Sequence, residues 1–441
     1  MENQKLQAGF SRVDMTPPLG AHIDGYYFDR WVEGVLDPLY INAVAVREGD
    51  KAVVAMTLDV MAILDEPADI LRNAAAEAAG IDPNAILMCG THTHTSVNVG
   101  RPKSDKQYFD WLKRRVGDAV VMALNDCKDV EQILFHEEDC PGTTFIRRFK
   151  MRGGYYQTWG VDNDPDMIDW AGTNDERVGL VRIIRTNAEE IVLVNFQSHP
   201  DNVSGSKVSA DYPGFLIKKV EAERPGTKCI YFNGAEGQLI CRDYRFSSIT
   251  REKYTAARLV GHKLADFVLA HMDEAKPVER TGVAFGRQEV PCKTKWDPKL
   301  LPEAERIIDI HENGDEEKEI GPDWVATPLV ADAYRIRELS ETKEEYTDVH
   351  VSSVAFGGLA LLGVSGEPFC ELGRAIRDHS PYPVTFVCCM ANGYGDYYPT
   401  AEAYDQGGYE PGCTRLVRGC GENLVEGSDK LLQRMYAESE Q

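Results

Sequence analysis

Short apolar segments alternate with amphipathic ones along most of the chain. Residues 51–58, 85–88 and 191–196 are largely apolar, short and bounded by turn residues, as is typical of buried strands. Residues 66–79 instead place apolar side chains at helical spacing and end at Gly80. Strands that alternate with helices in this way predict an α/β protein in which mixed β-sheets are flanked by helices.

This alternation is interrupted between residues 277 and 350. The segment is acidic and rich in loops, and its charged run 315–319 (Asp-Glu-Glu-Lys-Glu) is typical of a solvent-exposed face. The strand pattern returns with the apolar residues 351–364. We therefore expect one large domain over residues 1–441, with 277–350 as an insertion or cap.

Composition and charge narrow the classes of function. The chain has 441 residues, with 48 Lys and Arg against 71 Asp and Glu, which gives a net charge of −23. Nucleic acids and anionic membranes attract positive surfaces, so this balance excludes nucleic-acid binding and argues against stable membrane anchoring. The 11 cysteines include no Cys-x-x-Cys pair, and the N-terminal residues show no apolar run behind a basic start. We expect a cytoplasmic protein whose partner is a small-molecule substrate.

Polar side chains come directly after the ends of three apolar segments: first His92 and His94, then His199, then Glu367. Such side chains converge when the strands lie next to one another in a sheet. In an extended chain, residues i and i+2 point to the same face, so both imidazoles of the Thr-His-Thr-His segment reach one point. Two histidines and one carboxylate are usual protein ligands of a catalytic zinc ion. The pattern predicts a metal site at the strand ends.

Each of these residues also has a structural interpretation. His92 and His94 fit a surface strand on which histidine and threonine alternate. A lone histidine such as His199 is more often a hydrogen-bonded structural residue, and Glu367 also fits an N-cap role at the helix that follows it. The residues taken singly leave these alternatives open, whereas the set taken together favours the metal site.

Three motifs carry a resemblance to a known family. Residues 8–17 read AGFSRVDMTP, residues 90–95 read GTHTHT, and residues 392–397 read NGYGDY. In this order they resemble the N-terminal strand, the histidine segment and the tyrosine segment of the neutral/alkaline, non-lysosomal ceramidase family. The resemblance runs from about residue 6 to about residue 425, and it implies the fold of that family's catalytic domain.

The resemblance also implies roles for individual residues. It implies one zinc ion per chain, bound by the residues that match the family's ligands: His92, His199, Glu367 and Tyr397. His94 resembles the histidine that lies beside the metal-bound water. Arg148 is the best match to an arginine that contacts substrate, with Arg147 as the alternative, and Tyr409 resembles a tyrosine that donates to the substrate carbonyl.

The chain departs from the family pattern at three places. Some family members are assigned a nucleophilic serine, but residues 233–241 contain none, so a metal-bound water is the expected nucleophile. The chain ends soon after the tyrosine segment and lacks a secretion signal, so we expect no C-terminal β-sandwich domain and no extracellular lipid substrate. Asp201 and Asn202, which follow the second histidine, are more polar than a lipid channel needs, and we assign them to substrate binding.

These features predict a zinc-dependent hydrolase in which a metal-bound water attacks the carbonyl of a small, soluble N-acyl amide. The same chemistry would serve an ester or a lactone, and true ceramidase activity is a further alternative. A non-catalytic protein that binds a metal or ligand is the alternative from a different class. The full set of matching site positions argues against that last interpretation.

Overall fold

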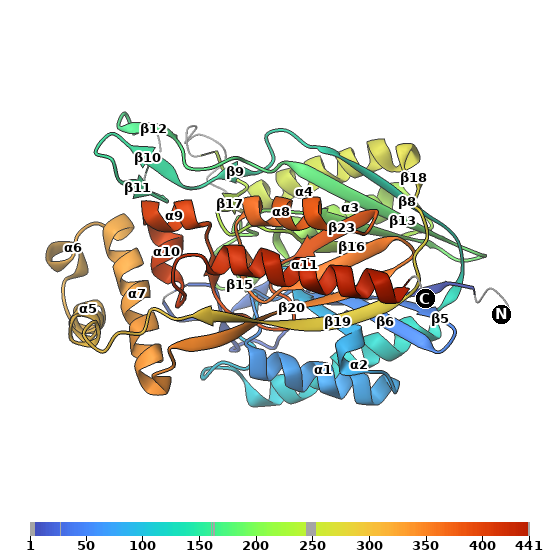
Figure 1. The fold of residues 1–441 in the computed structure, drawn as a ribbon, viewed down its shortest axis with the longest axis horizontal. Coiled ribbons are helices and arrows are strands. Elements are labelled where there is room, and N and C mark those ends of the chain that lie inside the picture. Colours follow the sequence, from blue (N-terminus) through green and yellow to red (C-terminus); the bar gives the residue numbers. More distant parts are fainter. Residues whose placement is uncertain (1–4, 27, 160, 162–163, 244–252, 440–441) are drawn as a thin grey trace.

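The computed structural model describes residues 5–26, 28–159, 161, 164–243 and 253–439. It contains a nine-stranded sheet in which eight strands follow the order β16-β14-β13-β8-β1-β5-β6-β7 and β18 pairs with β8 (Figure 1). The strands of this sheet are β1 (Gln7–Asp14), β5 (Tyr40–Glu48), β6 (Lys51–Leu58), β7 (Ile86–Gly90), β8 (Lys128–Asp139), β13 (Arg177–Arg185), β14 (Glu190–Phe196), β16 (Thr227–Asn233) and β18 (Lys276–Pro277).

A second sheet of four strands packs against the first. It comprises β19 (Ala284–Lys293), β20 (Tyr346–Phe356), β21 (Leu359–Val364) and β23 (Val384–Cys388), in the order β19-β20-β21-β23. One apolar cluster joins residues of the large sheet, such as Leu87 and Leu193, to residues of the small sheet, such as Val354 and Phe386. Because these side chains are removed from water between the two sheets, their burial fixes the sheets face to face.

Helices cover the outer faces of both sheets. In Figure 1, α1 (Asp65–Ala79) and α2 (Lys106–Asn125) lie side by side and pack on one part of the large sheet through a shared apolar cluster. A separate cluster joins α3 (Asp211–Glu223) and α4 (Lys253–His271) to the rest of that sheet. The small sheet is covered by α8 (Cys370–His379) and α11 (Cys420–Ser439). The predicted class, mixed sheets flanked by helices in one domain, is confirmed.

Short elements fill the connections. Five groups of short strands pair outside the two main sheets: β2 (His22–Ile23) with β3 (Arg30–Trp31); β4 (Gly34–Val35) with β15 (Lys207–Val208); β9 (Phe145–Ile146) with β17 (Leu239–Ile240); β22 (Glu367–Pro368) with β24 (Tyr397–Tyr398); and β10 (Phe149–Met151) with β11 (Tyr156–Gln157) and β12 (Met167–Trp170). The short helices are η1 (Pro83–Ala85), η2 (Met272–Glu274), α9 (Ala401–Gln406) and α10 (Tyr409–Cys413).

The acidic segment 277–350 divides into two parts in the structure. Its strands β19 and β20 belong to the small sheet, whereas α5 (Leu301–Asn313), α6 (Glu316–Glu319) and α7 (Asp323–Thr342) lie outside it, at one end of the molecule (Figure 1). These helices have an apolar core of their own, which includes Ile308 and Val330 and against which Trp296 packs. Ala331 of α7 packs against Tyr397 and Cys413, so this group of helices adjoins the tyrosine segment.

Parallel pairing brings several strand ends together. Within the two main sheets, the described parallel pairs are β6 with β7, β14 with β16, and β21 with β23. The turn after β23 ties the two sheets to each other, because Cys389 N donates to Asn233 O (3.0 Å) and Asn392 N donates to Met88 O (2.8 Å). The carboxyl ends of strands from both sheets therefore meet in one place. Among the described residues, no helix combines the length and apolar composition needed to cross a membrane.

Candidate metal centre

Four metal-binding side chains lie together where these strands end. His92, His199, Glu236 and Glu367 are all buried, and each offers one ligand atom within 4.8 Å of the others. The shortest contact, 3.1 Å, joins His199 Nε2 to Glu367 Oε2, and His92 Nε2 lies 3.7 Å from the same oxygen. His94 adjoins the cluster, with its Nε2 3.4 Å from His92 Nε2. The residues predicted from the strand ends are thus in contact.

Backbone carbonyls orient all three imidazoles. His92 Nδ1 donates to Met61 O (2.9 Å), His94 Nδ1 to Gly25 O (3.1 Å), and His199 Nδ1 to Leu239 O (2.9 Å). Because a carbonyl oxygen only accepts, each Nδ1 carries the proton and each Nε2 presents its lone pair to the cluster. This is the way in which metal-binding histidines are commonly held.

The electrostatics of the cluster fit a bound cation. Burial and the neighbouring Arg147 lower the pKa of His199 to about 3, and burial and His92 lower the pKa of His94 to about 3, so both rings are neutral. Burial opposes ionisation of Glu367, but His92 and His199 outweigh it and hold its pKa well below its ordinary value. Burial and the neighbouring Glu367 raise the pKa of Glu236 well above its ordinary value. A shared cation would compensate the close approach of the imidazole nitrogens and carboxyl oxygens in this cluster.

The backbone at His92 is unusual. Its φ is 71°, in the left-handed region that residues other than glycine seldom adopt, and its N–H donates to Val60 O (2.9 Å). Residues 91–93 therefore do not form the extended chain that the sequence pattern suggested. His92 and His94 still meet, because the left-handed residue turns the chain at the end of β7. Such strain persists where the surrounding structure holds the backbone in place.

Tyr397 and Arg147 border the cluster on another side. β22 and β24 pair in parallel so that Glu367 lies opposite Tyr397, and the Tyr397 hydroxyl lies 3.5 Å from His199 Nε2. Arg147 Nη2 donates to the Tyr397 hydroxyl (3.0 Å) and its Nε donates to Glu410 (2.9 Å). Tyr409 packs edge-on against Tyr397, with ring centroids 5.8 Å apart. These side chains place a positive charge and two aromatic rings beside the metal-binding atoms.

Arg148, the arginine that the resemblance favoured for substrate contact, has a different environment. Its guanidinium is buried and donates to Glu410 Oε2 (3.1 Å) and to the carbonyl oxygens of Ala403 (3.3 Å) and Gly407 (3.0 Å). These contacts link Arg148 to α9, to α10 and to the residue that follows α9. Arg147, which contacts Tyr397, is the arginine that borders the cluster.

We expect Arg148→Met to destabilise the protein by about 3 kcal/mol or more, because it removes one partner of a buried ion pair. Denaturant unfolding measures this change. Arg152→Met is the matched control, since Arg152 pairs with Asp166 while its side chain is 72% exposed, and such pairs contribute about 0–1 kcal/mol. Equal losses in the two variants would contradict a structural role for Arg148.

Asp201 and Asn202 lie on the far side of His94. The Tyr26 hydroxyl donates to Asp201, whose carboxylate is 4.0 Å from His94 Nδ1. Asn202 instead donates through its side chain to Asp211 (2.9 Å), at the start of α3. Asp201 therefore borders the candidate site, whereas the Asn202 amide supports the helix.

The sequence reasoning missed Glu236 and Tyr394. Tyr394 donates to Glu367 Oε1 (3.0 Å) and lies within the tyrosine segment. Glu236 lies in the turn that directly follows β16, so the strand-end argument used for His199 would have identified it.

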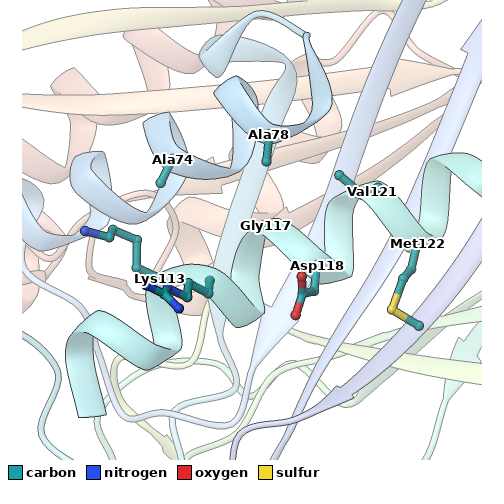
Figure 2. Close-up of a pocket in the computed structure, with 8 residues that line it drawn as sticks. Ala74, Ala78, Lys113, Gly117, Asp118, Val121 and Met122 are labelled. Atoms are coloured by element: carbon teal, nitrogen blue, oxygen red, sulfur yellow. The ribbon is translucent and has the colours of Figure 1, made fainter. Parts of the chain in front are cut away.

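A groove elsewhere on the molecule has no such chemistry. It lies between α1 and α2, has a volume of about 450 Å³, and is lined by side chains such as Lys113, Asp118, Val121 and Met122 (Figure 2). Its described lining residues include no histidine or cysteine. The metal-binding cluster is therefore the better candidate for a functional site.

The fold described above matches that of neutral ceramidase structures, which confirms the predicted resemblance at the level of the fold. The chain is similar to the crystal structure of neutral ceramidase from Pseudomonas aeruginosa, with a TM-score of 0.72 and 14% identity over 98% of this chain and 75% of that one. A structure of ceramidase complexed with C2 matches with the same TM-score and identity, over 98% and 76% of the two chains. No protein-family model and no curated protein matches the sequence.

Proposed function

We propose that this protein is a zinc-dependent hydrolase that cleaves the amide bond of an N-acyl substrate. The observation that carries this proposal is the buried cluster of histidine and glutamate side chains, whose lone pairs face one another within 4.8 Å. The ceramidase fold supports amide hydrolysis over other reactions. The zinc ligands we propose are those implied by the family resemblance: His92, His199, Glu367 and Tyr397.

Zinc, when bound, polarises a carbonyl oxygen and allows water to supply hydroxide near neutral pH. His94 is neutral and its Nε2 faces the cluster, so it accepts a proton from the attacking water. The same nitrogen then returns this proton to the departing amine, because an amine leaves only when it is protonated. The Arg147 guanidinium lies 5.7 Å from the centre of the Tyr409 ring. We assign to both side chains the donation of hydrogen bonds to the carbonyl oxygen as negative charge develops on it.

We propose that α5, α6 and α7 form a cap over this site. α7 packs against Tyr397 through Ala331, and Trp159 donates to Asp323 at the start of α7 (2.7 Å). Trp159 in turn packs edge-on against Tyr409, with ring centroids 4.9 Å apart. A cap at this position excludes water and limits the size of the substrate.

The substrate we propose is small, soluble and polar. Asp201 and Arg147 present opposite charges on two sides of the metal-binding atoms, and a ligand with polar groups at both ends would pair with them. The net charge of −23 opposes docking on anionic lipid. A protein that draws its substrate from a membrane would need a basic and apolar docking surface.

We expect kcat/KM for soluble N-acyl amides to exceed that for a short-chain ceramide in detergent by more than about tenfold, a difference of about 1.4 kcal/mol in transition-state binding. Steady-state kinetics on matched amide, ester and lactone substrates measure this preference and the bond cleaved. Chelation of the metal should abolish turnover, and added zinc should restore it. A clear preference for ceramide would contradict a soluble substrate and favour ceramidase activity. A lack of turnover on every substrate would favour the alternative that the protein binds a metal or ligand without catalysis.

A further inference from the structure

Glu236 is the most deeply buried member of the cluster, with an exposed fraction of 0%. Within the part of the chain that the structure describes, neither of its side-chain oxygens has a hydrogen-bond partner. The Cys389 thiol lies against it, but a thiol is only a weak donor. A buried carboxyl group with both oxygens unpaired is strongly unfavourable, so its presence requires an explanation.

The backbone prevents this carboxyl group from reaching water. Gly234 N donates to Phe196 O (2.9 Å) and Gly237 N donates to Pro368 O (3.0 Å), so the turn is fixed between β14 and β22. A side chain at Gly237 would have its Cβ 2.6 Å from Glu367 O, so the turn packs directly on the strand that carries this ligand. His199 Nδ1 also contacts the Glu236 carbonyl oxygen (3.1 Å). The turn therefore holds the Glu236 carboxyl group inside the cluster.

The distances in the cluster suit coordination of one ion. Ligand atoms on a tetrahedral zinc ion, with bonds of 2.0–2.1 Å, lie about 3.3 Å from one another. Glu236 Oε1 lies 3.9 Å from His92 Nε2, and the three contacts of the cluster span 3.1 to 3.9 Å. The Tyr397 hydroxyl, in contrast, already accepts a hydrogen bond from Arg147 (3.0 Å).

We infer that Glu236 is a further ligand of the metal, in addition to the residues of the proposed site. This inference rests on the metal site of the proposed function and adds a residue to it. Two carboxylates balance the charge of a divalent cation, and the ion supplies the partner that the Glu236 oxygens lack.

Glu236→Gln keeps the shape of the side chain and removes its charge, so it should weaken zinc binding. Changes to residues that merely support a ligand reduce metal affinity by about 10–100-fold, so loss of a ligand should raise the Kd by more than about 100-fold. Competition with a chromogenic chelator measures the Kd. Glu371→Gln is the matched control, because Glu371 lies near the same turn and its oxygens accept from Thr173 N and Gln238. The control should bind zinc like the wild type.

Stability without metal separates a ligand from a structural residue. Metal-free Glu236→Gln should melt at the same temperature as metal-free wild type or higher, because the amide keeps the shape of the side chain and leaves no second carboxyl group buried beside Glu367. Added zinc should raise its Tm by less than it raises that of the wild type. If Glu236→Gln fails to fold, Glu236→Ala allows the same comparison.

The outcomes distinguish this inference from the proposed function. If Glu236→Gln binds zinc with wild-type affinity and His92→Ala does not bind it, Glu236 is not a ligand. The metal site of the proposed function would then still stand. A wild-type protein that binds no zinc would overturn both. A metal-free Glu236→Gln that melts well below the wild type would show that Glu236 is structural, and this too would overturn the inference.

Discussion

His92→Ala is expected to remove the bound zinc and to lower kcat by roughly 10³-fold or more. The imidazole of His92 is oriented by Met61 O, and its Nε2 lies 3.7 Å from Glu367 Oε2, so the substitution removes one of the proposed ligand atoms. A catalytic metal contributes several kcal/mol to transition-state stabilisation, and each 1.4 kcal/mol corresponds to about tenfold in rate. Elemental analysis of the purified variant and steady-state kinetics measure the two losses together.

His350→Ala is the matched control for this loss. His350 is also a buried histidine, but its Nε2 contacts Asn392 O (3.2 Å) and it lies outside the metal-binding cluster. We expect this variant to retain zinc, with any change confined to stability. If His92→Ala holds as much zinc as the wild type, the metal site has been placed on the wrong residues.

His94→Ala should retain zinc and lose about 10²–10⁴-fold in kcat, the usual contribution of a general acid or base. His94 could itself hold a metal together with His92 and His199, but among the described contacts it forms no ion pair with Glu236 or Glu367. In our proposal it transfers protons, so His92, His199 and Glu367 hold the metal when it is removed. KM should change little, because the proton transfer occurs only as the bond breaks. Zinc content, kcat and KM of the variant test this division of roles.

Added imidazole provides a second test of His94. The cavity left by the alanine lies beside Gly25 and Tyr26, and free imidazole that enters it should restore part of the lost turnover. The same treatment should not rescue His92→Ala, which lacks the metal. Equal loss of zinc in the two histidine variants would contradict the assignment of His94 to proton transfer.

The sequence predicted the residues whose positions follow from topology. His92, His199 and Glu367 come at or just after the ends of strands, and the carboxyl ends of parallel strands meet at one edge of a sheet. The sequence also predicted the contact between His92 and His94, on the argument that residues i and i+2 of an extended chain point to the same face. That argument does not apply, because His92 has a φ of 71° and its backbone is not extended. The apolar pattern of the strands therefore predicts which residues form the site, but it does not predict their backbone conformation.

The choice between Arg147 and Arg148 depended on information that the sequence does not contain. Both arginines lie in the two-residue gap between β9 and β10, where no regular strand fixes which side chain faces the cluster. β9 is a two-residue strand whose direction is set by its pairing with β17 (Ile146 opposite Leu239) and by the bond from Arg147 N to Gln238 O (2.9 Å). Because β9 and β17 are far apart in the chain, their pairing produces no periodic pattern of apolar residues from which the sequence could predict it.

Because His92 has a left-handed backbone, selection of this protein for stability and selection for metal binding would favour different residues at position 92. A glycine at position 92 would adopt φ of 71° without steric penalty and would release about 1 kcal/mol or more of strain. Selection for heat resistance alone would therefore favour a glycine at the position that we assign to a metal ligand. A library screened for melting temperature would enrich inactive clones at this site, whereas screening for zinc retention together with heat resistance would keep the histidine.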